Sequence, residues 1–304
     1  MFDVSEPSLF LFELAMAIFI ATAILALLSH KSDQMTRFFG GIGSALGSAV
    51  FLILGLRLVL LAENVYAPKS ALALPFIKIF GDGALLFDHF NGIFFTLLGF
   101  IGIAASIYAM GYSRLHAKEH AISWLFAMTA LFIGSMGMVL AANHALTFLF
   151  AWELMTLTSF ALVVYQHEKP EVTRAGFLYL VTTHIATACL LAAFALIGQA
   201  TGSLLFSDWI GVMSVLTPGL GTFTFILLFI GFSIKAGLVP FHIWLPEAHP
   251  QAPTHISALM SGVMIKIAIY AFLRLVFTGF WDDMAPWWGL VIMTFGALSS
   301  VVGV

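Results

Sequence analysis

Five ionisable side chains stand inside long apolar runs of this sequence, where charged groups are costly. They are Glu13, Glu153, His184, Lys235 and Lys266. A charged residue at the centre of a bilayer costs at least about 2.5–3.5 kcal/mol on insertion scales, so it normally faces a bundle interior or water and has a partner. Carboxylate, imidazole and amine groups all exchange protons, and the chemistry that these residue types indicate is proton transfer.

Glu153 lies in the run LFLFAWELMTLTSF, which contains hydroxyl groups and no cation. Lys235 and Lys266 lie in two other apolar runs with no acid beside them. The economical arrangement is that these runs meet and that Glu153 partly compensates a lysine. A buried lysine near a carboxylate can bind and release a proton near neutral pH. The alternative is that the pair only holds two helices together.

The other two groups are open to more than one interpretation. His184, in YLVTTHIATACLL, is either a member of the same proton relay or a hydrogen-bonded packing residue. Glu13, near the start of the chain, is expected to be structural. Arg57 and Arg274 lie nearer the ends of apolar runs, from which a long side chain can reach the membrane interface.

The run LLFIGFSIKAGLVPFHIWLPEAH carries Gly237 and Pro240 within five positions of Lys235. Proline interrupts a helix, and irregular backbone at membrane depth is tolerated where it is buried in protein or lines a cavity. Discontinuous helices mark ion pathways in transporters. We therefore predict a helix break at Gly237 and Pro240; a kink without function is the alternative. His249, beyond the break, is a candidate proton entry point.

The segments that must position these side chains indicate a polytopic membrane protein. Of the 304 residues, 61% are hydrophobic and only 9% are charged, whereas soluble proteins carry about 25% charge. Segments long enough to cross a bilayer lie at 9–28, 38–61, 88–112, 121–141, 145–166, 174–199, 221–245, 256–279 and 287–304. The predicted fold is an all-α bundle of about nine transmembrane helices whose seventh helix is broken.

Lysine and arginine gather in alternate connections between these segments. The first, third and fifth connections contain Lys31, Arg37, Arg114, Lys118, Lys169 and Arg174. On the other side only the second connection is basic, with Lys69 and Lys78. The positive-inside rule places the odd-numbered connections in the cytoplasm and the N-terminus outside.

Several kinds of site are not expected in this chain. The single cysteine, Cys189, excludes an internal disulfide framework or an iron–sulfur site, and a net charge of −3 gives no reason to expect nucleic acid. The HAKEH stretch at 116–120 fits an H-x-x-E-H pattern, but it lies in a short connection without a third ligand. His242, His249 and His255 lack the i, i+4 spacing of a metal site, so no metal or cofactor is expected.

The stretch GFSIKAGLVPFHIWLPEAHPQAPTHISALMSGVMIKIAIYAFLRL resembles the signature of the antiporter-like proton-translocating membrane subunits. These subunits occur in respiratory complex I, in Mrp-type cation/proton antiporters and in group-4 membrane-bound NiFe hydrogenases. FAWELMTLTSFALV resembles the acidic helix of the same family, and HIWLPEAHPQAPTHISALMSGVMIK is most similar to the large membrane subunit of the hydrogenase-4 and formate hydrogenlyase type.

The resemblance implies roles for individual residues. The glutamate of the family's fifth helix falls on Glu153, and the lysine of its broken seventh helix falls on Lys235. The eighth-helix lysine falls on Lys266, while Ser261 stands about where other members place a histidine. Glu153 would then tune Lys235, and Lys266 would pass the proton toward the membrane centre, with water and His184 bridging the gaps.

The resemblance also implies an organisation. Residues 1–120 would form three N-terminal helices, 121–280 the first five-helix repeat, and 281–304 the start of a further helix. The second, inverted repeat of the family is missing, and the last segment stops without a polar flank. We therefore expect the chain to be the first half of a longer protein.

Three functions remain open at this point. The first is a proton-translocating subunit of a redox-driven complex in a bacterial or archaeal inner membrane, most consistent with a group-4 hydrogenase. Its partners would be other membrane subunits and peripheral redox subunits that carry the iron–sulfur clusters and the NiFe site, and no redox catalysis is expected in this chain. The second is a Mrp-like Na⁺/H⁺ antiporter or a complex I subunit. The third is a membrane anchor that conducts nothing.

Overall fold

The chain folds as a bundle of membrane-spanning helices. The computed structural model describes residues 5–61, 65–67, 84–116, 121–212, 216–280 and 285–303. Over these residues, eight helical spans are long and apolar enough to cross a membrane, and a further apolar helix, α13, is shorter. The predicted all-α membrane class is confirmed, and the ninth predicted segment corresponds to α13.

The first four spans and the short strands between them occur in chain order. They are α1 (Ser5–Leu28), the continuous α2 (Asp33–Arg37), η1 (Phe38–Ile42) and α3 (Gly43–Leu61), then β1 (Val65–Ala67), β2 (Leu85–Phe87), α5 (His89–His116) and α6 (Ile122–Ala141). The strands pair antiparallel with Val65 opposite Phe87. This two-stranded ribbon was not predicted, because each strand is only three residues long.

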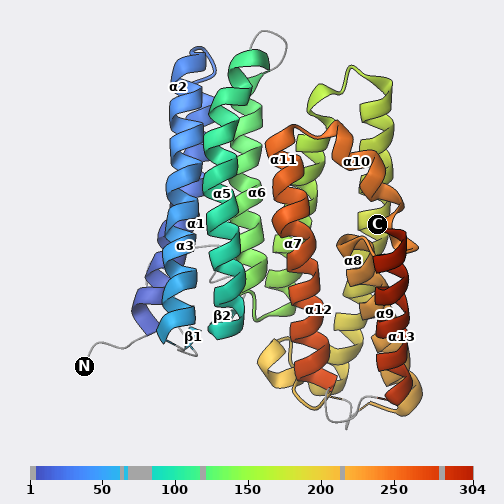
Figure 1. Cartoon of the computed structure of the whole chain (residues 1–304). Helices are drawn as coiled ribbons and strands as arrows, with labels where there is room; N and C mark the ends of the chain where they lie inside the picture. Colours follow the sequence, from blue (N-terminus) through green and yellow to red (C-terminus); the bar gives the residue numbers. More distant parts are fainter. Residues whose placement is uncertain are drawn as a thin grey trace.

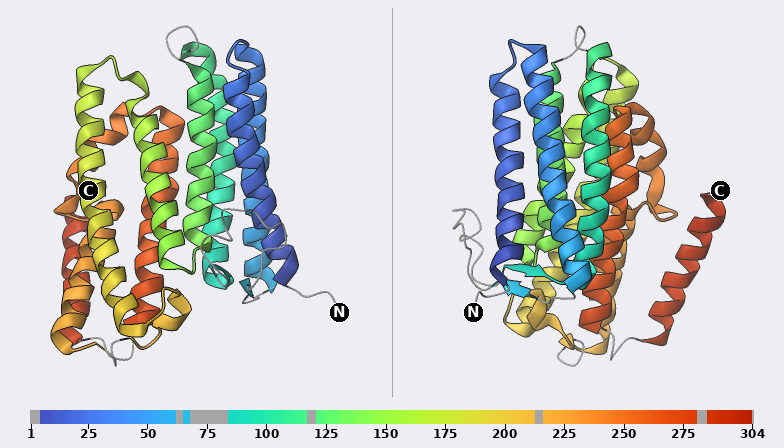
Figure 2. Two further views of the ribbon diagram at one scale, coloured as in Figure 1. Left: turned by 180° about the vertical axis from the view of Figure 1, so that it is seen from behind. Right: turned by 60° about the vertical axis from the view of Figure 1, so that its left-hand side comes forward.

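The remaining spans form the other half of the bundle. They are α7 (Ala145–Val163) with η2 (Val164–Gln166), α8 (Pro170–Thr201), η3 (Phe206–Trp209), α9 (Pro218–Ala236), η5 (Phe241–Trp244), α10 (Leu245–Gln251), α11 (Thr254–Leu259), η6 (Met260–Met264), α12 (Ile265–Phe280) and α13 (Pro286–Val302). Figure 1 shows α1, α3, α5 and α6 on one side and α7 to α13 on the other. In Figure 2, α13 stands at the margin of the bundle, where Trp288 stacks on Phe225 of α9.

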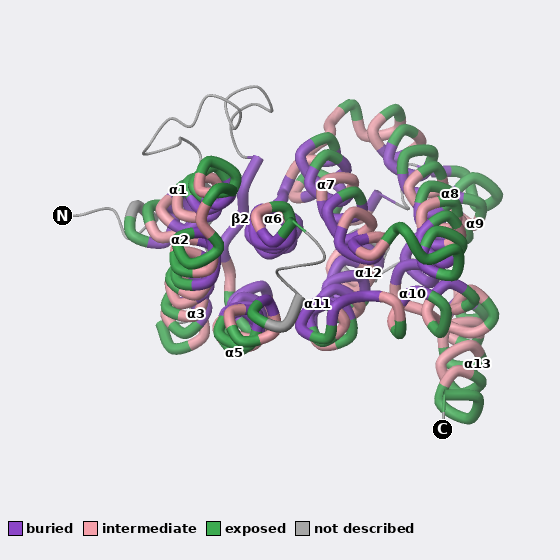
Figure 3. Tube along the Cα trace, turned by 90° about the horizontal axis from the view of Figure 1, so that it is seen from above, coloured by how far each residue is buried: buried purple, intermediate pink, exposed green. Residues whose placement is uncertain are grey.

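Helix α6 lies at the centre and is the most buried of the eight spans (Figure 3). Its sequence alternates bulky apolar residues with alanine and glycine, and such small residues let neighbouring helices approach closely. A Cβ atom at Gly137 would collide with the ring of Phe51 on α3. The absence of a side chain there therefore lets α3 and α6 pack together.

The seventh span is interrupted where the sequence predicts a break. Helix α9 ends at Gly237, whose φ of 71° is a left-handed conformation that glycine adopts without strain. Gly237 N–H donates to the carbonyl of Ile234, and Leu238 N–H donates to that of Ser233, the paired bonds of a Schellman cap. Pro240 follows, and the chain resumes as η5 and α10. Lys235 thus lies in the last turn of a half-helix.

The eighth span also departs from a regular α-helix. The π-helical turn η6 separates α11 from α12 and lies just before Lys266. Single π-helical turns inside α-helices are frequent at functional sites.

Some residues used in the predictions lie outside the described part of the chain. They are Lys69 and Lys78 of the second connection, Lys118 of the third, and most of the HAKEH stretch at 116–120.

Candidate functional site

Lys235 is the centre of the candidate site, and its side chain is fully buried. Its Nζ donates to Oγ1 of Thr156 on α7 at 2.8 Å and to the hydroxyl of Tyr179 on α8 at 2.9 Å. The same Nζ lies 5.1 Å from the centroid of the Tyr179 ring and 5.8 Å from that of Trp152. Two helices, α7 and α8, therefore surround the amine with hydroxyl groups and aromatic faces.

The helix break contributes to the electrostatics of this amine. The C-terminal end of a helix carries a partial negative charge and favours a cation in its last turn. Because Gly237 caps α9, that end of the helix lies next to Lys235. The cation–π contacts with Trp152 and Tyr179 add further attraction for a positive charge.

Glu153 does not form an ion pair with Lys235. Among the described residues no carboxylate lies within ion-pair distance of this amine, and the carboxylate of Glu153 acts on it from further away. Trp152 and Thr156, one turn apart on α7, are both buried and face Lys235. Helices α7 and α9 do meet, as the sequence predicts. The direct polar contact with Lys235, however, is made by the hydroxyl group of Thr156 and not by Glu153.

Glu153 instead lies beside His184 of α8. Oε2 of Glu153 is 3.6 Å from Nε2 of His184, and both side chains are partly exposed. The Nδ1 atom of His184 is 2.9 Å from the carbonyl oxygen of Leu180, which can only accept, so Nδ1 carries a proton. Nε2 then has a proton to offer Glu153 only when the ring is doubly protonated. Glu153 and His184 thus lie close enough for an ion pair when the ring is doubly protonated.

Tyr179 connects Lys235 to further polar atoms. Its hydroxyl lies 2.6 Å from Oγ of Ser159 and 3.7 Å from Sδ of Met264 in η6. Sequence reasoning missed Tyr179 and Ser159. The available signal was a tyrosine within the same apolar run as His184, but the helical face on which it lies depends on packing.

Lys266 and His249 lie apart from Lys235. Lys266 is exposed, and its Nζ donates to the carbonyl of Ser261 in η6 at 2.5 Å.

Nδ1 of His249 lies 3.0 Å from Oγ of Ser257, while its Nε2 is buried without a hydrogen-bond partner among the described residues. The ring of Trp244 packs against those of Tyr179 and His249, with centroids 4.9 and 6.3 Å away. Packed aromatic rings, rather than hydrogen bonds, join His249 to the Lys235 site.

A second cation, largely enclosed by the protein, is paired with a carboxylate. Nη2 of Arg274 on α12 lies 2.6 and 2.7 Å from the two carboxylate oxygens of Asp88. Its guanidinium carbon is 5.5 Å from the Phe90 ring centroid and 5.2 Å from that of Tyr270. Arg274 is therefore held by an ion pair with Asp88, and the prediction that its side chain reaches the membrane interface stays a prediction.

The partner Asp88 is itself fixed at the start of α5. Its carboxylate accepts from Asn91 N–H at 2.9 Å, and the Asn91 side chain accepts from Asp88 N–H at 3.0 Å. This reciprocal arrangement is a capping box. The spacing D-x-x-N before an apolar run could have revealed the cap, but not the ion pair with Arg274.

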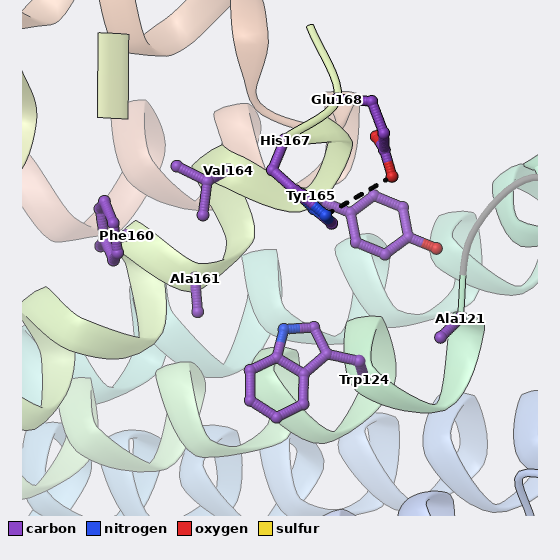
Figure 4. A pocket seen from close by; sticks show the side chains of 8 residues that line it. All are labelled: Ala121, Trp124, Phe160, Ala161, Val164, Tyr165, His167 and Glu168. Atoms are coloured by element: carbon purple, nitrogen blue, oxygen red, sulfur yellow. Dashed lines mark ion pairs between the residues drawn. The ribbon is translucent and has the colours of Figure 1, made fainter. Parts of the chain in front are cut away.

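A cavity of about 490 Å³ opens at the end of α7 (Figure 4). Trp124 and Tyr165 line it together with His167 and Glu168, whose Nε2 and Oε1 atoms are 3.7 Å apart. Phe160 also lines it and follows Ser159 directly in α7. The cavity therefore borders Phe160, whose neighbour in sequence, Ser159, contacts the hydroxyl group of Tyr179.

No group of three or more histidine, cysteine, aspartate or glutamate side chains could hold a metal ion in the described part of the chain. Glu13, the remaining ionisable group at membrane depth, is fully buried in α1.

Comparisons with known proteins agree with this architecture. Residues 142–304 match the sequence profile described as NADH:quinone oxidoreductase/Mrp antiporter, TM. Hydrogenase-4 component B of Escherichia coli (strain K12) is 36% identical over 226 residues, which cover 74% of this chain and 33% of that protein. Formate hydrogenlyase subunit 3 of the same strain is 28% identical over 285 residues, covering 94% and 43%. The chain thus spans less than half the length of these two curated relatives.

A solved structure shares the fold. A chain in the membrane-bound sulfane sulfur reductase, an archaeal respiratory membrane complex, superposes with a TM-score of 0.80 at 18% identity. The match covers 94% of this chain and 57% of that one.

Proposed function

Because this chain belongs to the NADH:quinone oxidoreductase/Mrp antiporter membrane family, we propose that it provides a proton-conducting half-channel of an antiporter-like subunit in a redox-driven complex. The observation that carries the proposal is the environment of Lys235: a fully buried amine at a helix break, contacted by hydroxyl groups and aromatic rings. Lys235 is the proton carrier of this half-channel.

The hydroxyl partners suit both protonation states of the amine. A hydroxyl group accepts and donates hydrogen bonds, whereas a carboxylate only accepts. Thr156 and Tyr179 accept from the charged amine, and Tyr179 can turn its proton toward the neutral amine. Because no carboxylate is paired directly with Lys235, loss of the proton leaves no buried anion stranded at the site.

The remaining predicted residues extend the pathway in this proposal. Glu153 and His184 form an acid–base pair on the same two helices that hold Thr156 and Tyr179, and Glu153 tunes Lys235 electrostatically. His249 is an entry point beyond the break at Gly237 and Pro240. Lys266 carries the proton onward from the eighth span.

The wider assignment rests on similarity to the two hydrogenase and formate hydrogenlyase proteins. We place the chain in a group-4 membrane-bound hydrogenase of a bacterial or archaeal cell membrane, with its N-terminus outside. Partner subunits would carry the iron–sulfur and NiFe cofactors. Residues 121–280 would be the first five-helix repeat, following three helices in 1–120 and followed by the start of another in 281–304.

The test is proton translocation by the assembled complex containing the full-length subunit, in vesicles. Lys235→Ala should abolish pH-gradient formation during redox turnover. Lys169→Ala, which alters an exposed lysine bonded to Gln166 in a connection, is the matched control and should leave the gradient intact.

Two outcomes favour the other candidates. A full gradient with Lys235→Ala, in a complex that assembles normally, would indicate a membrane anchor. Sodium-dependent pH changes driven by the purified full-length subunit alone in liposomes would indicate a Na⁺/H⁺ antiporter.

A further inference from the structure

A second polar cavity lies away from the Lys235 site, between the second and third spans. It measures about 350 Å³ and is lined by Gln34, Arg37, Phe38, Met110 and Arg114. Arg37 ends α2 and Arg114 lies in the last turns of α5, at the same end of the bundle (Figure 1). None of these residues takes part in the proton-transfer site.

The cavity combines two guanidinium groups and no acid. Among the described residues, neither Arg37 nor Arg114 has a hydrogen-bond or ion-pair partner, and no carboxylate lines the cavity. The macrodipole of α5 favours a cation at Arg114. It does not account for Arg37, because the second span continues through η1 and α3 beyond it. Two arginines with ten N–H donors between them thus line one cavity whose lining residues include no carboxylate.

Local sequence explains why the two arginines come together. Arg37 is followed by FFGGI, which forms the π-helical turn η1. A Cβ atom at Gly41 would collide with the side chain of Met110, and one at Gly40 would collide with Phe126. Because position 41 is glycine, α5 packs directly against η1, which brings Arg114 to the cavity that Arg37 lines, while Gly40 lets α6 approach the same turn.

One side of this cavity is bordered by apolar residues that face outward from the bundle. Phe38, which lines it, is 56% exposed, and Ile42 and Leu46 of the same span are also exposed. On α5, Ile107 is exposed two turns before Arg114. In a membrane-spanning helix these side chains contact lipid tails. The cavity therefore has a cationic end at the membrane surface and an apolar border beneath it.

We propose that Arg37 and Arg114 form a binding site for the phosphate group of an anionic phospholipid, with its acyl chains along η1, α3 and α5. Arginine forks match phosphate oxygens, and basic pockets between membrane helices bind anionic head groups. A lipid fits better than free phosphate because the cavity borders the apolar face. The proposal does not depend on proton conduction by Lys235.

Native mass spectrometry tests the site by measuring which lipid the chain retains after its bound lipid has been exchanged. The wild type should retain phosphatidylglycerol in preference to phosphatidylethanolamine. Loss of two arginine charges, in the double variant Arg37→Gln with Arg114→Gln, should weaken retention about thirtyfold. Arg174→Gln, at an exposed arginine of α8 that does not line the cavity, is the matched control. Equal retention of both lipids, or unchanged retention in the double variant, would overturn the proposal.

A photoactivatable phosphatidylglycerol tests the same site without any variant. Its label should map to the peptides that contain Phe38 and Met110. Labelling only elsewhere would contradict the site, and displacement of the label by millimolar inorganic phosphate would show a soluble anion site instead of a lipid site.

Discussion

Lys235 and Arg274 are two cations of the bundle that are stabilised in different ways. Arg274 lies against two aromatic rings and is paired with Asp88 at 2.6 Å. Lys235 also lies against two aromatic rings, but its polar contacts are the hydroxyl groups of Thr156 and Tyr179. Arginine is not deprotonated in proteins, whereas a buried lysine readily is. The comparison sets an ion pair between the start of α5 and α12 against a lysine that, in the proposed function, loses its charge.

The largest expected effect on stability comes from breaking the ion pair between Asp88 and Arg274. Asp88→Asn should lower the stability of the fold by about 3 kcal/mol, because it leaves a buried guanidinium without its counter-charge. Thermal unfolding in detergent measures the loss. Adding Arg274→Met should recover most of it, since both charges are then removed. A double variant as unstable as the single one would contradict this assignment.

Lys235→Met should abolish function without a loss of stability, in contrast to Asp88→Asn. Replacing the amine with an apolar side chain should leave the unfolding temperature unchanged or raise it, because burial of the charge costs energy and the partners keep other contacts. Thr156 still donates to the carbonyl of Trp152, and Tyr179 still contacts Ser159. Proton translocation by the assembled complex should disappear. A large loss of stability would make Lys235 a structural residue like Arg274.

Tyr179→Phe should produce an intermediate effect on function. It removes one of two hydroxyl partners of Lys235 but keeps the aromatic face. A hydrogen bond to a charged group contributes about 1.5–3 kcal/mol, so the proton-translocation rate should fall about tenfold or more. Tyr270→Phe, which removes a hydroxyl bonded to Leu140 near Arg274, is the control and should change the rate little. Equal effects of the two substitutions would show that Tyr179 has no special role.

Glu153→Gln should have a smaller effect, because the carboxylate acts on Lys235 without direct contact. The expected result is a shifted pH profile of coupled proton translocation with a similar maximal rate. His184→Gln should shift the profile as well, since it removes the partner of Glu153. Profiles that match the wild type in both variants would show that this pair does not influence Lys235.

The smallest expected effect concerns His144, which precedes α7 outside the spans. Its Nδ1 accepts the backbone N–H of Leu146 at 3.2 Å, and burial lowers the pKa of the ring below its usual value of 6.5. A lowered pKa in the folded state means that this cap stabilises the protein above pH 6.5 and is lost as the pH falls. The unfolding temperature should therefore decline slightly in acid, and His144→Asn should remove that part of the decline. An identical decline in both proteins would contradict the role of His144.

The sequence predicts those features that depend on residues close together along the chain. Apolar runs predict the membrane spans, and Gly237 with Pro240 predicts the break that follows Lys235. The ion pair between Asp88 and Arg274 joins residues 186 positions apart and was missed. The contact between Lys235 and Tyr179 was missed for the same reason, because it depends on how α8 is rotated against α9. The direct partner of a buried charge is set by packing, which local patterns do not contain.

In the proposed function Lys235 must lose its charge. The most direct test replaces this lysine with arginine and, as a comparison, replaces Arg274 with lysine. Lys235→Arg keeps a positive charge that does not titrate, while Arg274→Lys keeps the charge beside Asp88. Proton uptake into vesicles during redox turnover should be abolished by Lys235→Arg and retained by Arg274→Lys, both in fully assembled complex. Full proton uptake with Lys235→Arg would show that only the charge is needed there, and would contradict the account.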